Sequence, residues 1–433
     1  MQLGMKRRRG AMKRVSKYKP GDLNLEFNGG KVDLSHLLKL PNDKVKLVAL
    51  KPTLDGALLV AGGTLLSGAR CITKFTKAGN RDQAFGEDGV IDVNAFQSLQ
   101  VAGDGSFYMA DKLDRARLFV QKYLPNGNLD SSYGQDGVAI VDFAPVDQRS
   151  VADVSHASRF PEIGDSVTAM LSGKSLYLVS ASVWGGWGGF RTVVARLNEN
   201  GVLDQAFGEN GVYHFDSKEF GFSLPRGVDR QKTLPGREDL LLMLTQTGEY
   251  LGQPGLKGYL VRFTGGETID EQFGENGFYT FEMDEMEGVD FFVDEDQRIK
   301  LHGIYPGRAD LRIIGLSKDG KLDGGFNNGQ ELIIPAPPET IFGSNLRSHG
   351  VGETYRFVFH SATLAESAER TQVRRYLESG LADSHFGESG IVTLPRKQSE
   401  GFALLMPTFL EPVTPDGDLI HTTLDDIYWL LGS

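Results

Sequence analysis

The chain has 433 residues, of which 40% are hydrophobic and 54 are glycine. The glycines follow no Gly-X-Y period, which excludes a collagen-like fibre and is typical of a globular protein with many tight turns. Cys71 is the only cysteine, so the chain can form neither an intrachain disulfide nor a cage of thiolate metal ligands.

Charge is uneven along the chain, because residues 1–20 form a basic arm with eight of the 46 lysines and arginines and no acidic residue. Residues 21–433 carry the other 38 basic residues against 57 acidic ones. A body this acidic repels phosphate backbones, so nucleic acid is disfavoured as the main partner. The arm could tether the protein to nucleic acid or to an anionic membrane; we favour a solvated, disordered extension.

No targeting signal stands out in the sequence. The N-terminus lacks the apolar region of a secretory signal, and no apolar run approaches the roughly 18 residues that a membrane helix needs. We therefore expect no membrane span, and either a cytoplasmic location or export by a signal-independent route.

One short motif recurs seven times, at intervals of about 60 residues. It holds an aspartate, an aromatic residue three positions later, and two glycines around a short turn. The aspartate position is occupied by Asn24, Asp82, Asp130, Asp204, Asp270, Asp323 and Asp383. The aromatic position is occupied by Phe27, Phe85, Tyr133, Phe207, Phe273, Phe326 and Phe386.

Each part of the motif has a structural interpretation. The aspartate can bond backbone N–H groups just downstream in an Asx turn. The aromatic ring is suited to filling the space between neighbouring sheets. The glycines permit positive φ around a hairpin turn, with Asn28 and Asn327 replacing the first glycine in copies one and six. Calcium binding is the alternative, but each copy offers few of the six or more oxygens required, so we predict no cofactor.

The motif reads G-V-L-D-Q-A-F-G-E-N-G-V at 201–212 and resembles the block G-x-L-D-x-x-F-G-x-x-G-x-V of the bacterial delta-60 repeat family. The resemblance covers essentially the whole chain after residue 20. Departures are local: Asn24 replaces the aspartate, Tyr133 the phenylalanine and Glu267 the first glycine. The resemblance implies a repeat architecture and no particular activity.

Short apolar runs separate the motif copies and predict four strands per unit, as at 45–50, 57–62, 71–75 and 89–93. Four strands with tight turns are the content of one propeller blade. The predicted blades are 45–93, 95–142, 151–215, 221–281, 288–335, 340–395, and 401–433 together with 21–34.

The strands predicted at the two chain ends indicate whether the array closes into a ring. The last unit has three strands (402–406, 418–422 and 427–431), and the first supplies only a fourth strand (31–34). We therefore predict an all-β, seven-bladed β-propeller of four-stranded antiparallel blades. It is one domain over 21–433, closed by an N-terminal strand that completes the C-terminal blade. A linear solenoid is the alternative.

If the motif turns join third to fourth strands, the variable loops lie on the opposite face, where a repeat scaffold presents ligand-binding residues. The candidate ligand residues occupy two glycine-rich loops and are Trp184, Trp187, Phe190, Arg191 and Tyr250. Tryptophans among glycines suit a sugar ring or a protein hot spot. Alternatively, these aromatics fold back onto their own blade.

Catalytic signatures are absent. The eight histidines show no metal-site spacing, although His302 and His360 occupy equivalent strand positions and could face a central channel. The acidic run 282–290 is typical of a solvated face. Three hypotheses remain: a non-catalytic scaffold for a protein or carbohydrate ligand, a hydrolase-like propeller enzyme with its site at the channel mouth, and a purely structural repeat protein. We expect a monomer.

Overall fold

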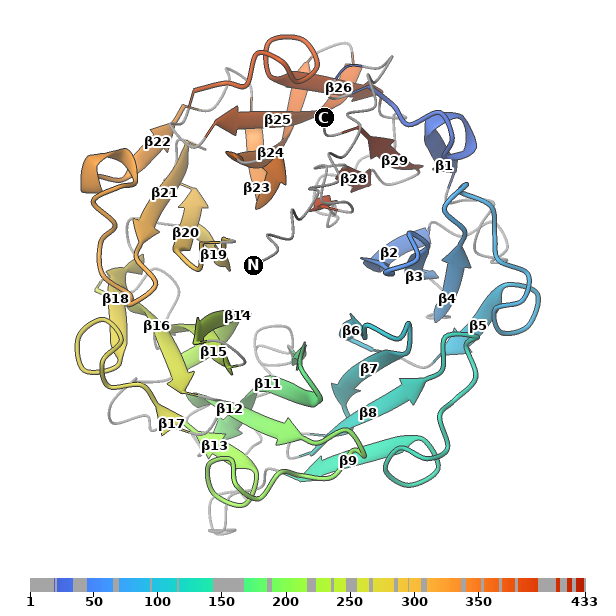
Figure 1. Ribbon diagram of the computed structural model, residues 1–433, viewed down its shortest axis with the longest axis vertical. Helices are drawn as coiled ribbons and strands as arrows, with labels where there is room; N and C mark the ends of the chain where they lie inside the picture. The colour runs from blue at the N-terminus through green and yellow to red at the C-terminus, as the bar shows by residue number, and fades with distance from the viewer. Residues whose placement is uncertain are drawn as a thin grey trace, which may run out of the picture.

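The strands surround a central axis, with each sheet extending outward from it (Figure 1). The computed structural model describes residues 19, 22–33, 45–64, 70–93, 96–114, 117–142, 167–184, 189–215, 223–234, 237–246, 255–264, 268–283, 287–294, 296–304, 310–335, 340–351, 354–365, 368–377, 381–395, 410–412, 419–422 and 426–431. Most of the basic arm lies outside these residues. Within them the strands form seven antiparallel sheets.

Six sheets are built from consecutive strands. The first contains β2 (Val45–Pro52), β3 (Leu58–Thr64), β4 (Arg70–Phe75) and β5 (Val90–Val93). The second contains β6 (Ser98–Val101), β7 (Phe107–Lys112), β8 (Arg117–Tyr123) and β9 (Val138–Asp142). The third contains β10 (Val167–Ser172), β11 (Ser175–Trp184), β12 (Gly189–Leu197) and β13 (Val212–His214).

The fourth sheet contains β14 (Ser223–Leu234), β15 (Arg237–Gln246), β16 (Lys257–Thr264), β17 (Thr268–Ile269) and β18 (Phe278–Glu282). Its fourth strand is split, because β17 and β18 both pair with β16 on either side of a motif turn. The fifth contains β19 (Glu287–Val293), β20 (Ile299–Ile304), β21 (Leu311–Leu316) and β22 (Leu332–Ile334). The sixth contains β23 (Thr340–Val351), β24 (Thr354–Ala365), β25 (Ala368–Leu377) and β26 (Ile391–Pro395).

The remaining sheet joins the two ends of the sequence. It contains β27 (Leu410–Pro412), β28 (Leu419–Thr422), β29 (Asp426–Leu430) and β1 (Lys31–Asp33), in the order β1-β29-β28-β27. Val32 pairs with Ile427, and the fully buried ring of Phe27 lies 5.3 Å from that of Trp429. The predicted all-β class and the four-stranded antiparallel sheets are therefore confirmed.

The core is divided among the junctions between neighbouring sheets. Strand β15 shows why, since its side chains alternate between two hydrophobic clusters. Leu240, Leu242 and Leu244 pack toward the third sheet, whereas Leu241 and Met243 pack toward the fifth. A strand in the middle of a sheet is thus buried on both faces, which explains its nearly continuous apolar sequence.

Candidate functional site

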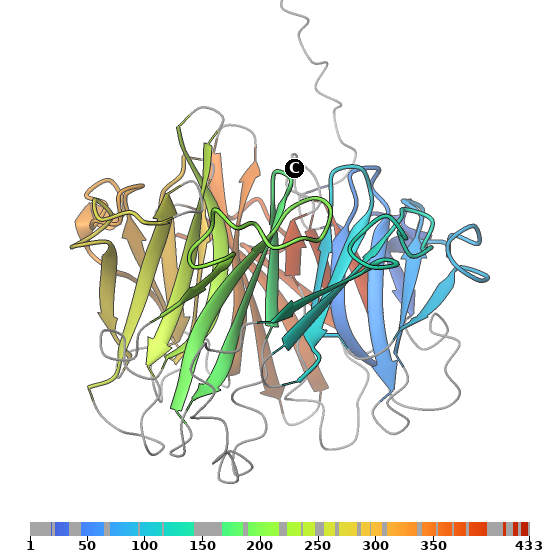
Figure 2. The ribbon, with the colours of Figure 1, turned by 90° about the horizontal axis from the view of Figure 1, so that it is seen from below.

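The motif forms the same turn in every copy. The side-chain oxygen at the aspartate position accepts a hydrogen bond from the backbone N–H two residues later, at 2.9–3.2 Å in all seven copies. This is the Asx turn, which fixes the chain direction before the hairpin. The turns lie between the third and fourth strands, and Figure 2 shows them in the upper half of the molecule.

A basic side chain faces the second carboxylate oxygen in five copies. It lies on the third strand, eight positions before the aspartate, at N–O distances of 2.7–3.8 Å. These residues are Lys74, Lys122, Arg196, Arg262 and Arg375. Four of them also lie over the motif ring at 4.5–5.9 Å, a cation–π contact. The fixed spacing of eight was visible in the sequence but was missed.

Copies one and six show how the pair is replaced. In copy one both charges are lost together: Asn24 stands at the acidic position and Trp429 at the basic one. In copy six the basic position holds Gly315, where a Cβ would lie 2.4 Å from the Phe326 ring. Its cross-strand partner Lys300 covers that ring instead, at 4.7 Å. Lys300 on the neighbouring strand β20 thus supplies the cation–π contact that a third-strand residue supplies in other copies.

The motif also ties each sheet to the next. The backbone N–H that follows the aromatic residue donates to a carbonyl of the next copy at 2.8–3.0 Å in four junctions. The donor–acceptor pairs are Asn28–Ala78, Gly86–Asn126, Gly134–Asn200 and Gly274–Asp319. The glycine after each acceptor lies against the preceding aromatic ring, as Gly201 does against Tyr133, where a Cβ would lie 2.9 Å from the ring. The remaining junctions involve residues outside the described ranges.

The predicted ligand loops are only partly described. Trp187 and Tyr250 lie outside the described residues. Trp184 ends β11, and Phe190 and Arg191 belong to β12, in a hairpin whose register pairs Trp184 with Gly189.

The two histidines that were expected to face the channel both lie on the second strand of their sheets. His302, on β20, is 4% exposed, pairs in register with Asp290 on β19 and lies 6.0 Å from the ring of Phe292. Its ring is therefore buried among neighbouring strands. The backbone of His360 belongs to β24.

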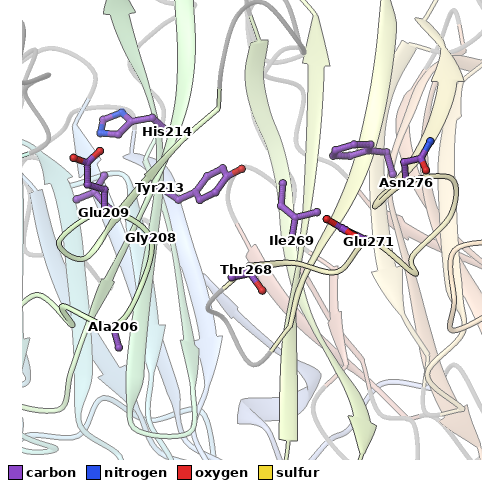
Figure 3. A pocket seen from close by; sticks show the side chains of 11 residues that line it. Ala206, Gly208, Glu209, Tyr213, His214, Thr268, Ile269, Glu271 and Asn276 are labelled. Carbon is purple, nitrogen blue, oxygen red and sulfur yellow. The ribbon is translucent and has the colours of Figure 1, made fainter.

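A groove of about 760 Å³ lies between the outer strands of the third and fourth sheets, at β13 and β17. It has an apolar floor and a polar rim, and half-buried Tyr213 lies between them. Figure 3 shows Tyr213 projecting from the β13 side toward Ile269 and Glu271. The lining residues used below are Glu209, Tyr213, Thr268, Ile269, Glu271 and Phe278.

The ring of Tyr213 is held in place by two other rings. Phe215 and Phe263 each lie 5.1 Å from it in edge-to-face geometry. Such pairs contribute about 0.5–1.5 kcal/mol beyond buried area, so the ring direction is set before any ligand arrives. Ile269 and Phe278 pack against the same hydrophobic cluster.

The preceding junction carries a smaller groove of about 300 Å³. There Gln135 and Ala139 occupy the motif positions that Glu209 and Tyr213 occupy in the larger groove. The smaller groove therefore lacks the acid and the aromatic ring of the larger one. Sequence reasoning missed them because they occupy positions that vary between motif copies.

Two carboxylates on inner strands also serve the fold. Asp229 on β14 accepts hydrogen bonds from the N–H groups of Arg230 (2.8 Å) and of Val293 on the next sheet (2.9 Å). Burial, with a smaller effect from Asp290, raises the pKa of Asp229. Asp290 accepts from the N–H of Phe291 at 2.8 Å. Both side chains thus bond to the backbone near the junction of these sheets.

The cysteine is equally unsuited to chemistry. Cys71 is 2% exposed, and burial, followed by the charge of Asp92, raises the pKa of its thiol to about 12. A thiol in this state is not a nucleophile at neutral pH. Among the described residues, no group of three or more His, Cys, Asp or Glu side chains is placed to hold a metal ion. No helix in the described ranges is long and apolar enough to span a membrane.

Neither the protein-family models nor the curated proteins include a match to this chain. Among solved structures, Semaphorin 2a from Drosophila is similar at a TM-score of 0.42 and 9% identity, over 96% of this chain and 77% of that one. The β-propeller domain of the Trilobed protease from Pyrococcus furiosus gives 0.44 and 9%, over 91% and 95%. The polysaccharide lyase Uly1 gives 0.46 and 11%, over 89% of each chain. These similarities are too low to bear on function.

Proposed function

We propose that the chain is a closed seven-bladed β-propeller of the delta-60 repeat type, in which β1 completes the last blade. Seven motif copies and seven sheets in the described residues support this, together with the pairing of β1 with β29. Closure buries an edge strand that would otherwise be open to pairing with another chain.

Deleting residues 1–33 tests the closure. The deletion removes β1 and the fully buried Phe27, and it exposes the edge of β29, so the variant should melt at a clearly lower temperature and aggregate. A deletion of residues 1–18 alone serves as the control and should melt like the full chain. Equal melting temperatures for the two deletions would contradict closure by this strand.

We further propose that the protein is a non-catalytic binding scaffold. The observation that carries this proposal is the use of the motif carboxylates: each shapes an Asx turn, and five also pair with a buried or half-buried base. A carboxylate that is committed in this way is unavailable as a general acid or nucleophile. What the described surface offers a ligand is a groove with a fixed aromatic ring.

A hydrolase-like enzyme would need carboxylates that converge on one site with unequal, functional pKa values. Asp229, whose pKa is raised by burial, and Asp290 on the next sheet both accept backbone hydrogen bonds, which commits their oxygens to the fold. This favours binding over catalysis.

Glycan and peptide arrays test the proposal. The wild-type protein should retain a ligand, and the ligand should have an unchanged mass after long incubation. A Trp184→Ala/Trp187→Ala variant and a Glu209→Gln/Glu271→Gln variant assign the bound ligand to the loop or to the groove. The groove variant should lose affinity for a ligand held by these two charges by up to about thirtyfold, if each exposed charge contact contributes up to about 1 kcal/mol. Turnover of any bound ligand would contradict the scaffold proposal.

A further inference from the structure

We propose that the groove between β13 and β17 binds a neutral sugar ring against the side chain of Tyr213. This inference rests on the proposed scaffold function and names the class of its ligand. It concerns the face of the motif turns rather than the opposite, variable face on which the sequence placed the ligand.

The backbone on the β13 side of the groove is already used by the motif turn. The N–H of Val212 donates to the carbonyl of Glu209 at 3.2 Å, and the N–H of Glu209 donates to the carbonyl of Val212 at 2.7 Å. An extended peptide therefore has no open edge to pair with at the start of β13. A ligand at this place has to be held by side chains, as a sugar ring can be.

Tyr213 supplies the flat apolar surface that a sugar ring requires. Its side chain is half-buried and lines the groove, and the rings of Phe215 and Phe263 hold it from 5.1 Å away. The axial C–H groups of a pyranose are apolar and slightly positive, so they pack against the negative face of an aromatic ring. Because the Tyr213 ring is fixed beforehand, binding loses little side-chain entropy.

The polar groups near this ring suit hydroxyl groups rather than charges. Figure 3 shows Tyr213 extending toward Glu271 and away from Glu209. The exposed Glu271 carboxylate accepts hydrogen bonds from hydroxyl groups, and the exposed hydroxyl of Thr268 can donate or accept. No lysine or arginine occurs among the described residues that line the groove, so an anionic sugar would meet no opposite charge there.

The groove is large enough for a short oligosaccharide. Its volume of about 760 Å³ falls within the range of roughly 300–1,000 Å³ that is usual for small-molecule sites. Ile269 and Phe278 add apolar surface from the next sheet, which a neighbouring sugar unit can cover. The smaller groove has Ala139 at the motif position of Tyr213, so it offers no ring at that position. We therefore place the sugar in the larger groove.

Isothermal calorimetry and saturation-transfer NMR with short sugars test the inference. The neutral probes are cellotriose, mannotriose, xylotriose and galactotriose, and trigalacturonate is the charged counterpart of the last. The full-length protein should bind at least one neutral trimer, with saturation transfer to its ring C–H protons and little change at high salt. It should not bind trigalacturonate. The absence of binding for every neutral trimer would overturn the inference.

Substitutions at the groove test the stacking contact. Tyr213→Ala should weaken binding of that neutral trimer about tenfold, whereas Tyr213→Phe keeps the ring and should stay within about threefold of wild type. Glu271→Gln leaves the core untouched and should weaken binding about threefold, because a neutral oxygen accepts a weaker hydrogen bond from a hydroxyl group. Equal affinity of wild type and Tyr213→Ala would contradict stacking on this ring.

Tyr279 provides a matched control for the alanine variant. It occupies in copy five the motif position that Tyr213 occupies in copy four, and it is likewise half-buried against a hydrophobic cluster. Tyr279→Ala should lower the melting temperature by a similar amount and should leave trimer binding within about twofold of wild type. Similar losses of binding for the two alanine variants would mean that general destabilisation is the cause, and the inference would fail.

Two further outcomes separate this inference from the scaffold proposal. If no neutral trimer binds but a peptide on the arrays does, the ligand class is wrong and the scaffold stands. If a bound trimer is shortened in a reaction that Glu271→Gln prevents, the scaffold proposal itself fails.

Discussion

Replacing Arg375 by methionine is expected to lower the free energy of unfolding by about 3–5 kcal/mol, because it leaves a buried carboxylate without its partner. Arg375 and Asp383 are each 2% exposed, and Arg375 Nε donates to Asp383 Oδ2 at 2.9 Å. The guanidinium also covers the Phe386 ring at 4.5 Å. Urea denaturation, monitored by tryptophan fluorescence and by circular dichroism, measures the loss.

Two comparisons make this prediction specific. Arg375→Met/Asp383→Asn should recover more than half of the loss, because the neutral asparagine keeps the Asx turn, as Asn24 does in copy one. Arg117→Met breaks an exposed pair with Asp114 and should lower stability far less than Arg375→Met does. If the single and double variants at Arg375 were equally destabilised, the uncompensated charge would not be the cause.

Gly134→Ala is expected to destabilise the protein by about 3 kcal/mol or more, since it combines backbone strain with a steric clash. Gly134 has φ +56°, and a Cβ there would lie 2.2 Å from the carbonyl oxygen of Val138. The clash is with backbone at the start of the fourth strand, so a rotamer change cannot relieve it. Thermal and urea unfolding measure the effect.

Gly173 supplies a matched control for this substitution. It has the same φ of +56°, and a Cβ there would meet nothing within 4 Å. Gly173→Ala therefore has only the left-handed strain, about 1–2 kcal/mol. The difference between the two variants measures the clash, and equal losses would show that the motif glycine is required for its φ alone.

The turn geometry shows how far sequence reasoning reached. Asn28 and Asn327, read as substitutes for the first glycine, both have φ of +43°. A third left-handed position, between the two glycines, was not anticipated. It is held by Asp88, Asp136, Asn210, Asn276 and Ser389, with φ of 53–54°. Four of these five are Asp or Asn, which tolerate this region, so the sequence contained a usable signal.

The candidate site was less accessible to sequence reasoning. Aromatic residues among glycines directed attention to Trp184 and Trp187, whereas the groove is formed by Tyr213 on one sheet and Thr268 and Glu271 on the next. More than 50 residues separate its two sides in the chain. The distance between the two sides of the groove depends on how far neighbouring sheets separate at their outer strands. Local sequence patterns do not predict that separation.

The sequence by itself determined the repeat, the strands and the turns, because each depends on residues within a few positions of one another. Asp130 reaches the N–H of Ser132, and alternating apolar residues place a strand between two sheets. Only the tertiary structure decided which polar groups were left to meet a ligand. Arg262 pairs with Asp270 across two strands and Gly274 bonds to Asp319 across two sheets, whereas Glu209 and Glu271 remain at an exposed rim. A carboxylate is structural or available according to what packs beside it, and that neighbour is set by the stacking of sheets.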